Sequence, residues 1–131
     1  MGCFTFSYGI YLKEKTIMRS ILELLQNETT VWFYLKEQEA KQRFVKELNL
    51  LGATYLNGAP VTAESCSPIM AVHPDGKVAH LMIRIWNASF SPSFPTQYAG
   101  DVNKIRKVDY AKYISGEEDF LCQRSAFMPI L

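Results

Sequence analysis

The sequence lacks most of the features that usually reveal a function. It holds no complete catalytic motif and no glycine-rich phosphate loop of either common type. No apolar run approaches the roughly 18 residues that a membrane-spanning helix needs. The formal net charge is only +1, so no overall field attracts the chain to extended nucleic acid or to anionic lipid. Any anion site must therefore be local.

Cysteines are also scarce. The chain has three, Cys3, Cys66 and Cys122, which are far apart and belong to no CxxC pair and no Cys/His cluster. This pattern argues against a zinc site and indicates free thiols in a reducing compartment. We therefore expect a cytoplasmic protein that holds no metal or other cofactor.

The composition that remains is that of an ordinary globular protein. With 48% hydrophobic and 21% charged residues, the chain can bury one core, and we expect a single domain over residues 1–131. Large apolar residues alternate from Phe4 to Leu12, which predicts a strand with one buried face. Met18 lies near the start of a predicted helix and is an alternative start of the chain.

Periodicity places the remaining elements. Helical spacing predicts helices over residues 16–26 and 36–51, with Gly52 as a left-handed cap on the second. β-Branched and aromatic runs predict strands, and the sequence His73-Pro74-Asp75-Gly76-Lys77 predicts a hairpin turn between the last two strands of the core. The predicted strands cover residues 29–35, 53–56, 67–72, 78–86 and 103–108. Asp109 caps a predicted helical turn over residues 109–114, and the tail from about residue 115 to 131 docks on the body or on a second copy.

These elements predict an α+β fold. The core order is β-α-β-β-β, with a mostly antiparallel sheet and two helices packed on one face. Several isolated residues have the chemistry of a site, but none has a suitable partner nearby in the sequence. His73 and His80 are expected on a turn and a strand surface, Cys66 has no neighbouring base, and the acidic run Glu117-Glu118-Asp119 is typical of a solvated surface.

The most unusual segment follows Trp86, where a predicted loop of about fifteen residues carries three aromatic rings. One interpretation is that the rings cover the end of the sheet or an oligomer interface. The other is that they stack on the base of a small nucleotide, while arginines hold phosphates and an asparagine reads a base edge or a ribose hydroxyl. The candidate ligand-binding residues are Arg84, Asn87, Phe90, Phe94, Tyr98 and Arg106.

Four segments together resemble small proteins of phages that infect Gram-positive bacteria. They are residues 31–51, the run Gly-Ala-Thr-Tyr-Leu-Asn-Gly at 52–58, the turn Pro-Asp-Gly-Lys at 74–77, and residues 108–119. The chain resembles in particular the Thoeris anti-defence proteins, which are oligomeric sponges for a cyclic ADP-ribose signal. The resemblance implies a non-enzymatic protein that sequesters a small cyclic nucleotide or cyclic ADP-ribose-type immune signal, as a homo-oligomer of two or more copies in the host cytoplasm.

Two other functions stay open at this point. The first is a protein-binding inhibitor of a bacterial immune effector, similar to an anti-CRISPR, which would dock through the aromatic loop and the tail. The second is a small nuclease or phosphodiesterase that uses His73, His80 and the acidic tail, and the sequence supports it least.

Overall fold

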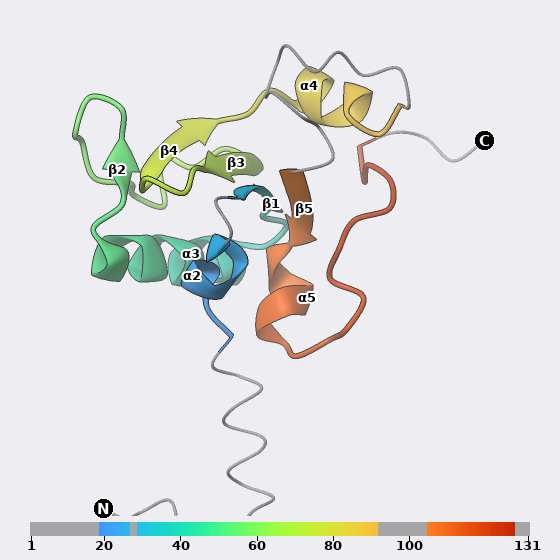
Figure 1. Cartoon of the computed structure of the whole chain (residues 1–131), viewed down its shortest axis with the longest axis horizontal. Helices are drawn as coiled ribbons and strands as arrows, with labels where there is room; N and C mark the ends of the chain where they lie inside the picture. Colours follow the sequence, from blue (N-terminus) through green and yellow to red (C-terminus); the bar gives the residue numbers. More distant parts are fainter. Residues whose placement is uncertain (1–18, 27–28, 92–104, 128–131) are drawn as a thin grey trace, which may run out of the picture.

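A computed structural model describes residues 19–26, 29–91 and 105–127, and it has an α+β architecture around a single five-stranded sheet (Figure 1). The strand order is β2-β4-β3-β1-β5. The predicted strand at residues 4–12 lies outside the described residues. In chain order, the elements are α2 (Ile21–Leu24), β1 (Thr30–Tyr34), α3 (Gln38–Leu51), β2 (Thr54–Tyr55), β3 (Ile69–Val72), β4 (Lys77–His80), α4 (Ile83–Ala88), β5 (Ile105–Asp109) and α5 (Tyr110–Ile114).

The sheet is mixed, which corrects the prediction of a mostly antiparallel one. β1 pairs with β3 and β3 with β4 in antiparallel register, but β1 pairs with β5 and β2 with β4 in parallel register. The apolar pattern of a strand indicates which of its faces are buried, but it does not indicate whether the neighbouring strand is parallel or antiparallel. The pairing direction therefore could not be predicted from the sequence. The predicted order β-α-β-β-β is confirmed for β1, α3, β2, β3 and β4.

Helix α3 follows the prediction closely. Ala40, Phe44 and Leu48 recur every four residues and are all buried, so this stripe anchors the helix to the sheet. The helix ends at Gly52, whose φ of 77° is the left-handed conformation expected of a glycine cap. Residues 16–18 of the first predicted helix lie outside the described residues, and α2 begins at Ile21 because Ser20 and Glu23 form a capping box there.

The hairpin between β3 and β4 is also confirmed. His73 N–H donates to the Lys77 carbonyl at 2.9 Å, and Asp75 Oδ1 accepts from Lys77 N–H at 3.0 Å. The prediction that this strand continues to Trp86 is wrong, because β4 ends at His80 and residues 83–88 form helix α4. In the helix, Trp86 is buried and its ring lies 6.5 Å from that of Trp32 on the sheet. The packing of this large ring therefore outweighs the strand propensity of the surrounding residues.

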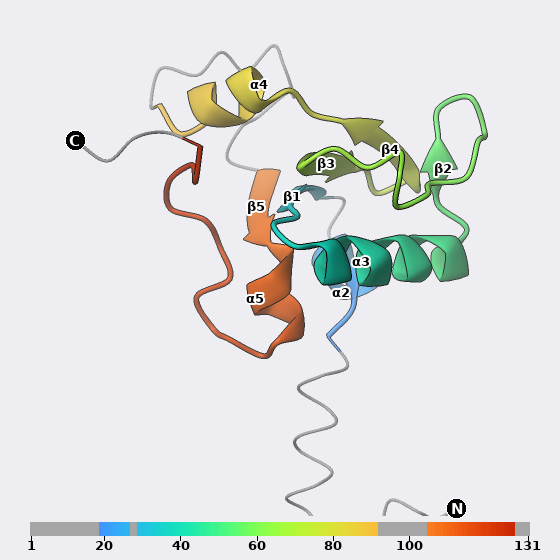
Figure 2. The same cartoon turned by 180° about the vertical axis from the view of Figure 1, so that it is seen from behind.

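The sheet has two unlike faces. Side chains of Val31, Phe33, Met70, Val72 and Val108 point toward α2, α3 and α5, and together they form the larger core. Alternate residues of the same strands, Trp32, Ile69, Ala71 and Ile105, point to the other face, where they pack with Trp86 of α4. The expectation of two helices on one face is therefore corrected to three on one face and α4 on the other (Figure 2).

The chain after α5 docks on the body, as one of the two alternatives for the tail predicted. Asp109 caps α5 by accepting from Lys112 N–H, as expected. Residues 117–127, called the arm below, then run back along β5. Asp109 N–H donates to the Phe120 carbonyl and Cys122 N–H to the Lys107 carbonyl, both at 2.8 Å, so the arm covers the exposed edge of β5. Within the described parts of the chain, no helix is long and apolar enough to cross a bilayer.

Candidate ligand cleft

The structure places three of the predicted site residues on or just after α4. Arg84 and Asn87 belong to the helix, and Phe90 follows it. Phe94 and Tyr98 lie outside the described residues. Arg84 is exposed, whereas Asn87 Oδ1 accepts a short hydrogen bond from Ser125 Oγ of the arm. Asn87 therefore joins α4 to the arm.

Phe90 is half-buried and has a packing role. Its ring meets the ring of Trp86 edge-on, at 5.2 Å between centroids, and the ammonium of Lys107 lies 4.4 Å from its centre. Lys107 Nζ also donates to the Ser89 carbonyl at 3.0 Å. Burial lowers the pKa of Lys107, because the charged form loses solvation there.

Arg106 is not brought together with the α4 residues. Its neighbours Ile105 and Lys107 point to the face of the sheet that α4 covers. Arg106 points to the same face as Val108, which belongs to the larger core under α2, α3 and α5. Burial raises the pKa of Tyr113 of α5 to about 12, and the charge of Arg106 opposes this rise with a smaller effect. Strand alternation therefore places Arg106 on the opposite face from Arg84, Asn87 and Phe90.

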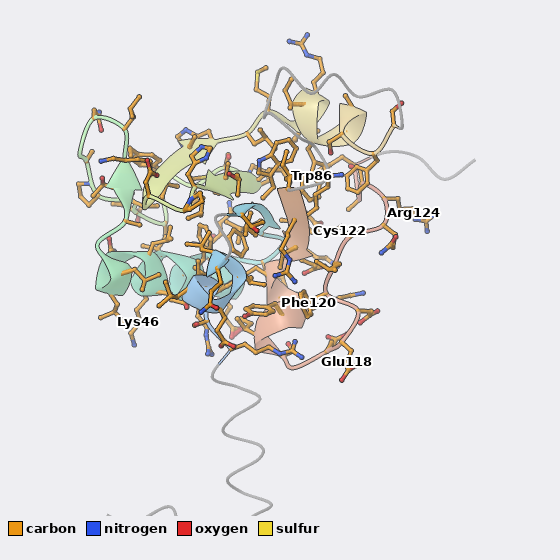
Figure 3. All side chains as sticks on the ribbon, in the orientation of Figure 1. Lys46, Trp86, Glu118, Phe120, Cys122 and Arg124 are labelled. Carbon is orange, nitrogen blue, oxygen red and sulfur yellow. The ribbon has the colours of Figure 1, made fainter. Side chains whose placement is uncertain are left out.

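A cleft of about 600 Å³ opens beside the predicted residues, between the arm and the ends of β1 and β5. Tyr34 and Asp109, which end these two parallel strands, are paired in register. Figure 3 shows Phe120, Cys122 and Arg124 along the arm, and Trp86 at the upper end of β5, below α4. The cleft is lined by Tyr34, Trp86, Asp109, Lys112 and residues 118–126.

Aromatic rings form one wall of this cleft. The rings of Tyr34 and Trp86 lie 6.5 Å apart and 30° from parallel, and Phe127 meets Tyr34 edge-on at 5.5 Å. Trp86 is 1% exposed. Its indole Nε1 is a buried donor, and no group among the described residues accepts a hydrogen bond from it. Buried donors in native proteins are almost always satisfied, so this one is an exception that calls for a partner.

The arm is attached differently at its base and at its tip. At the base, two backbone hydrogen bonds hold it to β5, and the Arg19 guanidinium lies 5.0 Å from the centre of the Phe120 ring and donates to the Glu117 carbonyl at 2.6 Å. At the tip, the described residues make two attachments to the body: the hydrogen bond of Ser125 to Asn87 and the edge contact of Phe127 with Tyr34. The tip is therefore the less firmly held part.

Titratable groups in the cleft favour neutral forms of the thiol and the phenol. Burial, followed by the charge of Asp109, raises the pKa of Cys122 to about 12. Burial and Asp109 also raise the pKa of Tyr34. Three acids and two bases line the cleft, and one pair of them, Lys112 and Asp119, forms an exposed ion pair at 3.2 Å. Arg124 is exposed at the rim.

A larger hollow of about 930 Å³ lies between α3, α5 and Arg19. Side chains of both charges line it, and no aromatic ring of a described residue does. The carboxylate of Glu47, one of the lining residues, already accepts hydrogen bonds from Tyr110 Oη at 2.9 Å and from Ile21 N–H. This hollow offers a ligand less specific contact than the arm cleft.

The histidines and the cysteine weighed for catalysis have other surroundings in the structure. His80 Nε2 meets the Ser65 carbonyl, and His73 Nδ1 lies 3.3 Å from Thr30 Oγ1. Cys66 is buried, and burial raises the pKa of its thiol. Across the described ranges, no three His, Cys, Asp or Glu side chains gather closely enough to hold a metal ion.

Sequence reasoning missed the arm residues and Tyr34. A tail that docks on the body or on a second copy was predicted, but nothing in it indicated which strand end it would cover. Comparison of the chain with protein-family models, with curated proteins and with solved structures found no match.

Proposed function

We propose that this protein binds and sequesters a small nucleotide-type molecule without chemical turnover, with the base of the ligand in the arm cleft. The observation that carries the proposal is the aromatic wall of Tyr34 and Trp86 inside a cleft of about 600 Å³. Ligand pockets for small molecules usually measure about 300–1,000 Å³ and combine apolar walls with a few placed polar groups.

Aromatic rings suit the flat faces of nucleobases. Stacking on one ring contributes about 1–3 kcal/mol per base in proteins that bind single strands. At the rim, the exposed Arg124 is suited to a phosphate, because a guanidinium can donate two parallel hydrogen bonds. The mixed charges of the lining and the net charge of +1 favour a small ligand over a long nucleic acid.

The resemblance to Thoeris anti-defence proteins extends the proposal to a biological role. In that role the chain is phage-encoded, forms a homo-oligomer and holds a cyclic nucleotide or a cyclic ADP-ribose-type immune signal in the host cytoplasm. The site proposed from the structure is the arm cleft. It differs from the set of ligand-binding residues predicted from the sequence. Of that set, Arg84 lies on α4, whereas Arg106 points to the opposite face of the sheet.

Calorimetric titration with cyclic dinucleotides, cyclic ADP-ribose isomers and nucleoside monophosphates tests the proposal. We expect micromolar or tighter binding of at least one of them, and recovery of that ligand unchanged by mass spectrometry after heat release. Tyr34→Leu removes the stacking ring and should weaken binding at least tenfold. Tyr55→Leu, on strand β2 away from the cleft, is the matched control and should not. No binding at micromolar concentrations, or a chemically altered ligand, would contradict the proposal.

A steric inhibitor of a bacterial protein is the second candidate. The observation that favours it is the exposure of two large apolar side chains at the start of α4, Met82 at 55% and Ile83 at 38%. A pull-down from host lysate distinguishes the two, because a ligand sponge recovers no stoichiometric protein. Met82→Lys should abolish recovery of an inhibitor's target and leave nucleotide binding unchanged.

A further inference from the structure

We propose that Trp86 determines which ligands the cleft accepts, by donating a hydrogen bond from its indole Nε1 to an acceptor on the edge of a nucleobase. This inference rests on the proposed function, since it concerns the same cleft. It assigns a specific contact and a chemical requirement: a planar ligand that carries a ring nitrogen or a carbonyl oxygen on its edge.

Trp86 lines the cleft, and its indole nitrogen is the buried side-chain polar group that has no hydrogen-bond partner among the described residues. Trp86 is held on several sides by rings, with Trp32 at 6.5 Å, Tyr34 at 6.5 Å and Phe90 at 5.2 Å between centroids. These contacts fix the ring in place. Its Nε1 is buried and meets no acceptor among the described residues. A rigid donor without a partner is prepared for one that arrives from outside.

The chemistry of the donor limits the class of ligand. An indole N–H can only donate, so its partner must be an acceptor. Nucleobases carry ring nitrogens and carbonyl oxygens on their edges, and the neighbouring ring of Tyr34 offers a flat surface for their faces. A hydrocarbon ring of similar size would stack equally well and would leave the indole nitrogen unsatisfied.

In this proposal, the tip of the arm moves to admit the ligand. The nitrogen is shielded from solvent, and Ser125 and Ala126 of the tip line the same cleft as Trp86. The tip is held by the Ser125–Asn87 hydrogen bond and by the contact of Phe127 with Tyr34, while the base is paired with β5. A base that stacks on Tyr34 therefore takes the place of the Phe127 ring, and residues 125–127 shift.

A matched pair of probes tests the donor. Nucleoside monophosphates (AMP, GMP and UMP) carry acceptors on their rings, and 1-naphthyl phosphate carries a ring and a phosphate without any ring acceptor. We expect the preferred nucleotide to bind the wild-type protein about tenfold more tightly than 1-naphthyl phosphate does, as one hydrogen bond in a buried site can give. Trp86→Phe should weaken the nucleotide about tenfold and change the affinity for 1-naphthyl phosphate less than twofold.

Nuclear magnetic resonance provides a readout that needs no substitution at Trp86. The chain has two tryptophans, so Trp32→Phe assigns the two indole N–H signals and serves as the matched control for folding. We expect the signal of the Trp86 indole proton to move downfield when the nucleotide binds. With 1-naphthyl phosphate it should keep the chemical shift of the free protein. Equal weakening of both probes by Trp86→Phe, or an unmoved indole signal with a bound nucleotide, overturns this inference and leaves the proposed function standing. Absence of binding by every probe and every cyclic nucleotide overturns both.

Discussion

The two faces of the sheet use the same five strands for different purposes. The face toward α2, α3 and α5 buries a broad set of aliphatic and aromatic side chains, among them Phe33, Phe44 and Tyr110, whose rings lie 5.1–5.7 Å apart. The face toward α4 buries a smaller cluster around Trp32 and Trp86, and this cluster leads into the arm cleft.

Their polar groups differ in the same way. On the helix face, Glu47 accepts from Tyr110 and from the first N–H of α2, and Tyr113 Oη donates to the Ser20 carbonyl at 2.8 Å. On the α4 face, the Trp86 nitrogen has no acceptor in the described chain, and the Lys107 ammonium is partly buried against Phe90. Proteins tend to depart from full polar satisfaction at functional sites. From this comparison we expect the helix face to supply most of the stability and the α4 face to carry the binding site.

The largest expected effect separates the two faces by one matched pair of substitutions. Phe44→Ala deletes a fully buried ring from the helix face and should lower the free energy of unfolding by about 3–5 kcal/mol. Phe90→Ala removes a half-buried ring from the α4 face and should cost roughly 1–2 kcal/mol. Urea unfolding followed by circular dichroism measures both. Equal losses would break the comparison.

A second pair examines the polar network of the helix face. Tyr110→Phe removes a donor to a carboxylate and should lower the free energy of unfolding by about 1.5–3 kcal/mol. Tyr113→Phe removes a donor to a neutral carbonyl, so its cost should be nearer 0.5–1.5 kcal/mol. The same urea titrations provide the values. An unchanged free energy of unfolding in Tyr110→Phe would mean that the hydrogen bond to Glu47 does not stabilise the protein.

A third substitution sharpens the contrast between the base and the tip of the arm. Arg19→Ala removes a cation above the rings of Tyr113 and Phe120 and two hydrogen bonds to backbone carbonyls, at a cost of about 1 kcal/mol. Hydrogen exchange should then become faster at the amides of Asp109 and Cys122, which hold the base to β5. Arg124→Ala, at the exposed rim, is the control and should leave both amides protected.

The smallest effect at neutral pH concerns the thiol in the cleft. Because the pKa of Cys122 rises from 9.0 to about 12 on folding, the folded state favours the protonated thiol. Its contribution to stability is complete below pH 9 and is lost as the pH rises toward 12. Stability measured from pH 8 upward should therefore fall less steeply for Cys122→Ser than for the wild type. Tyr113, with a pKa raised to about 12, adds a decline above pH 10 in both proteins. Parallel curves would show that Cys122 titrates alike in the folded and unfolded states.

Local features of the fold were predictable because their causes are local. The buried stripe of α3, the Gly52 cap, the hairpin at Pro74-Asp75-Gly76 and the Asp109 cap each depend on residues within a few positions of one another. The strand predicted through Trp86 was wrong, because the ring of Trp86 packs on Trp32 from a distant part of the chain.

The candidate site was harder to predict for the same reason. Two of the predicted residues, Asn87 and Phe90, contact Ser125 and Trp86, which line the cleft. The prediction grouped Arg106 with them, although strand alternation and the register of β5 against β1 turn that side chain to the helix face.

By itself, the sequence determined the element order from β1 to β4, the buried stripe of the long helix and the caps and turn, because periodicity and capping act over a few residues. Only the tertiary structure decided the parallel pairing of β5 with β1, the placement of α4 on its own face and the course of the arm. The cleft exists because Tyr34, Trp86 and residues 118–126 meet there. Those contacts join residues between positions 34 and 126, and their free energy depends on packing and not on any short stretch of residues.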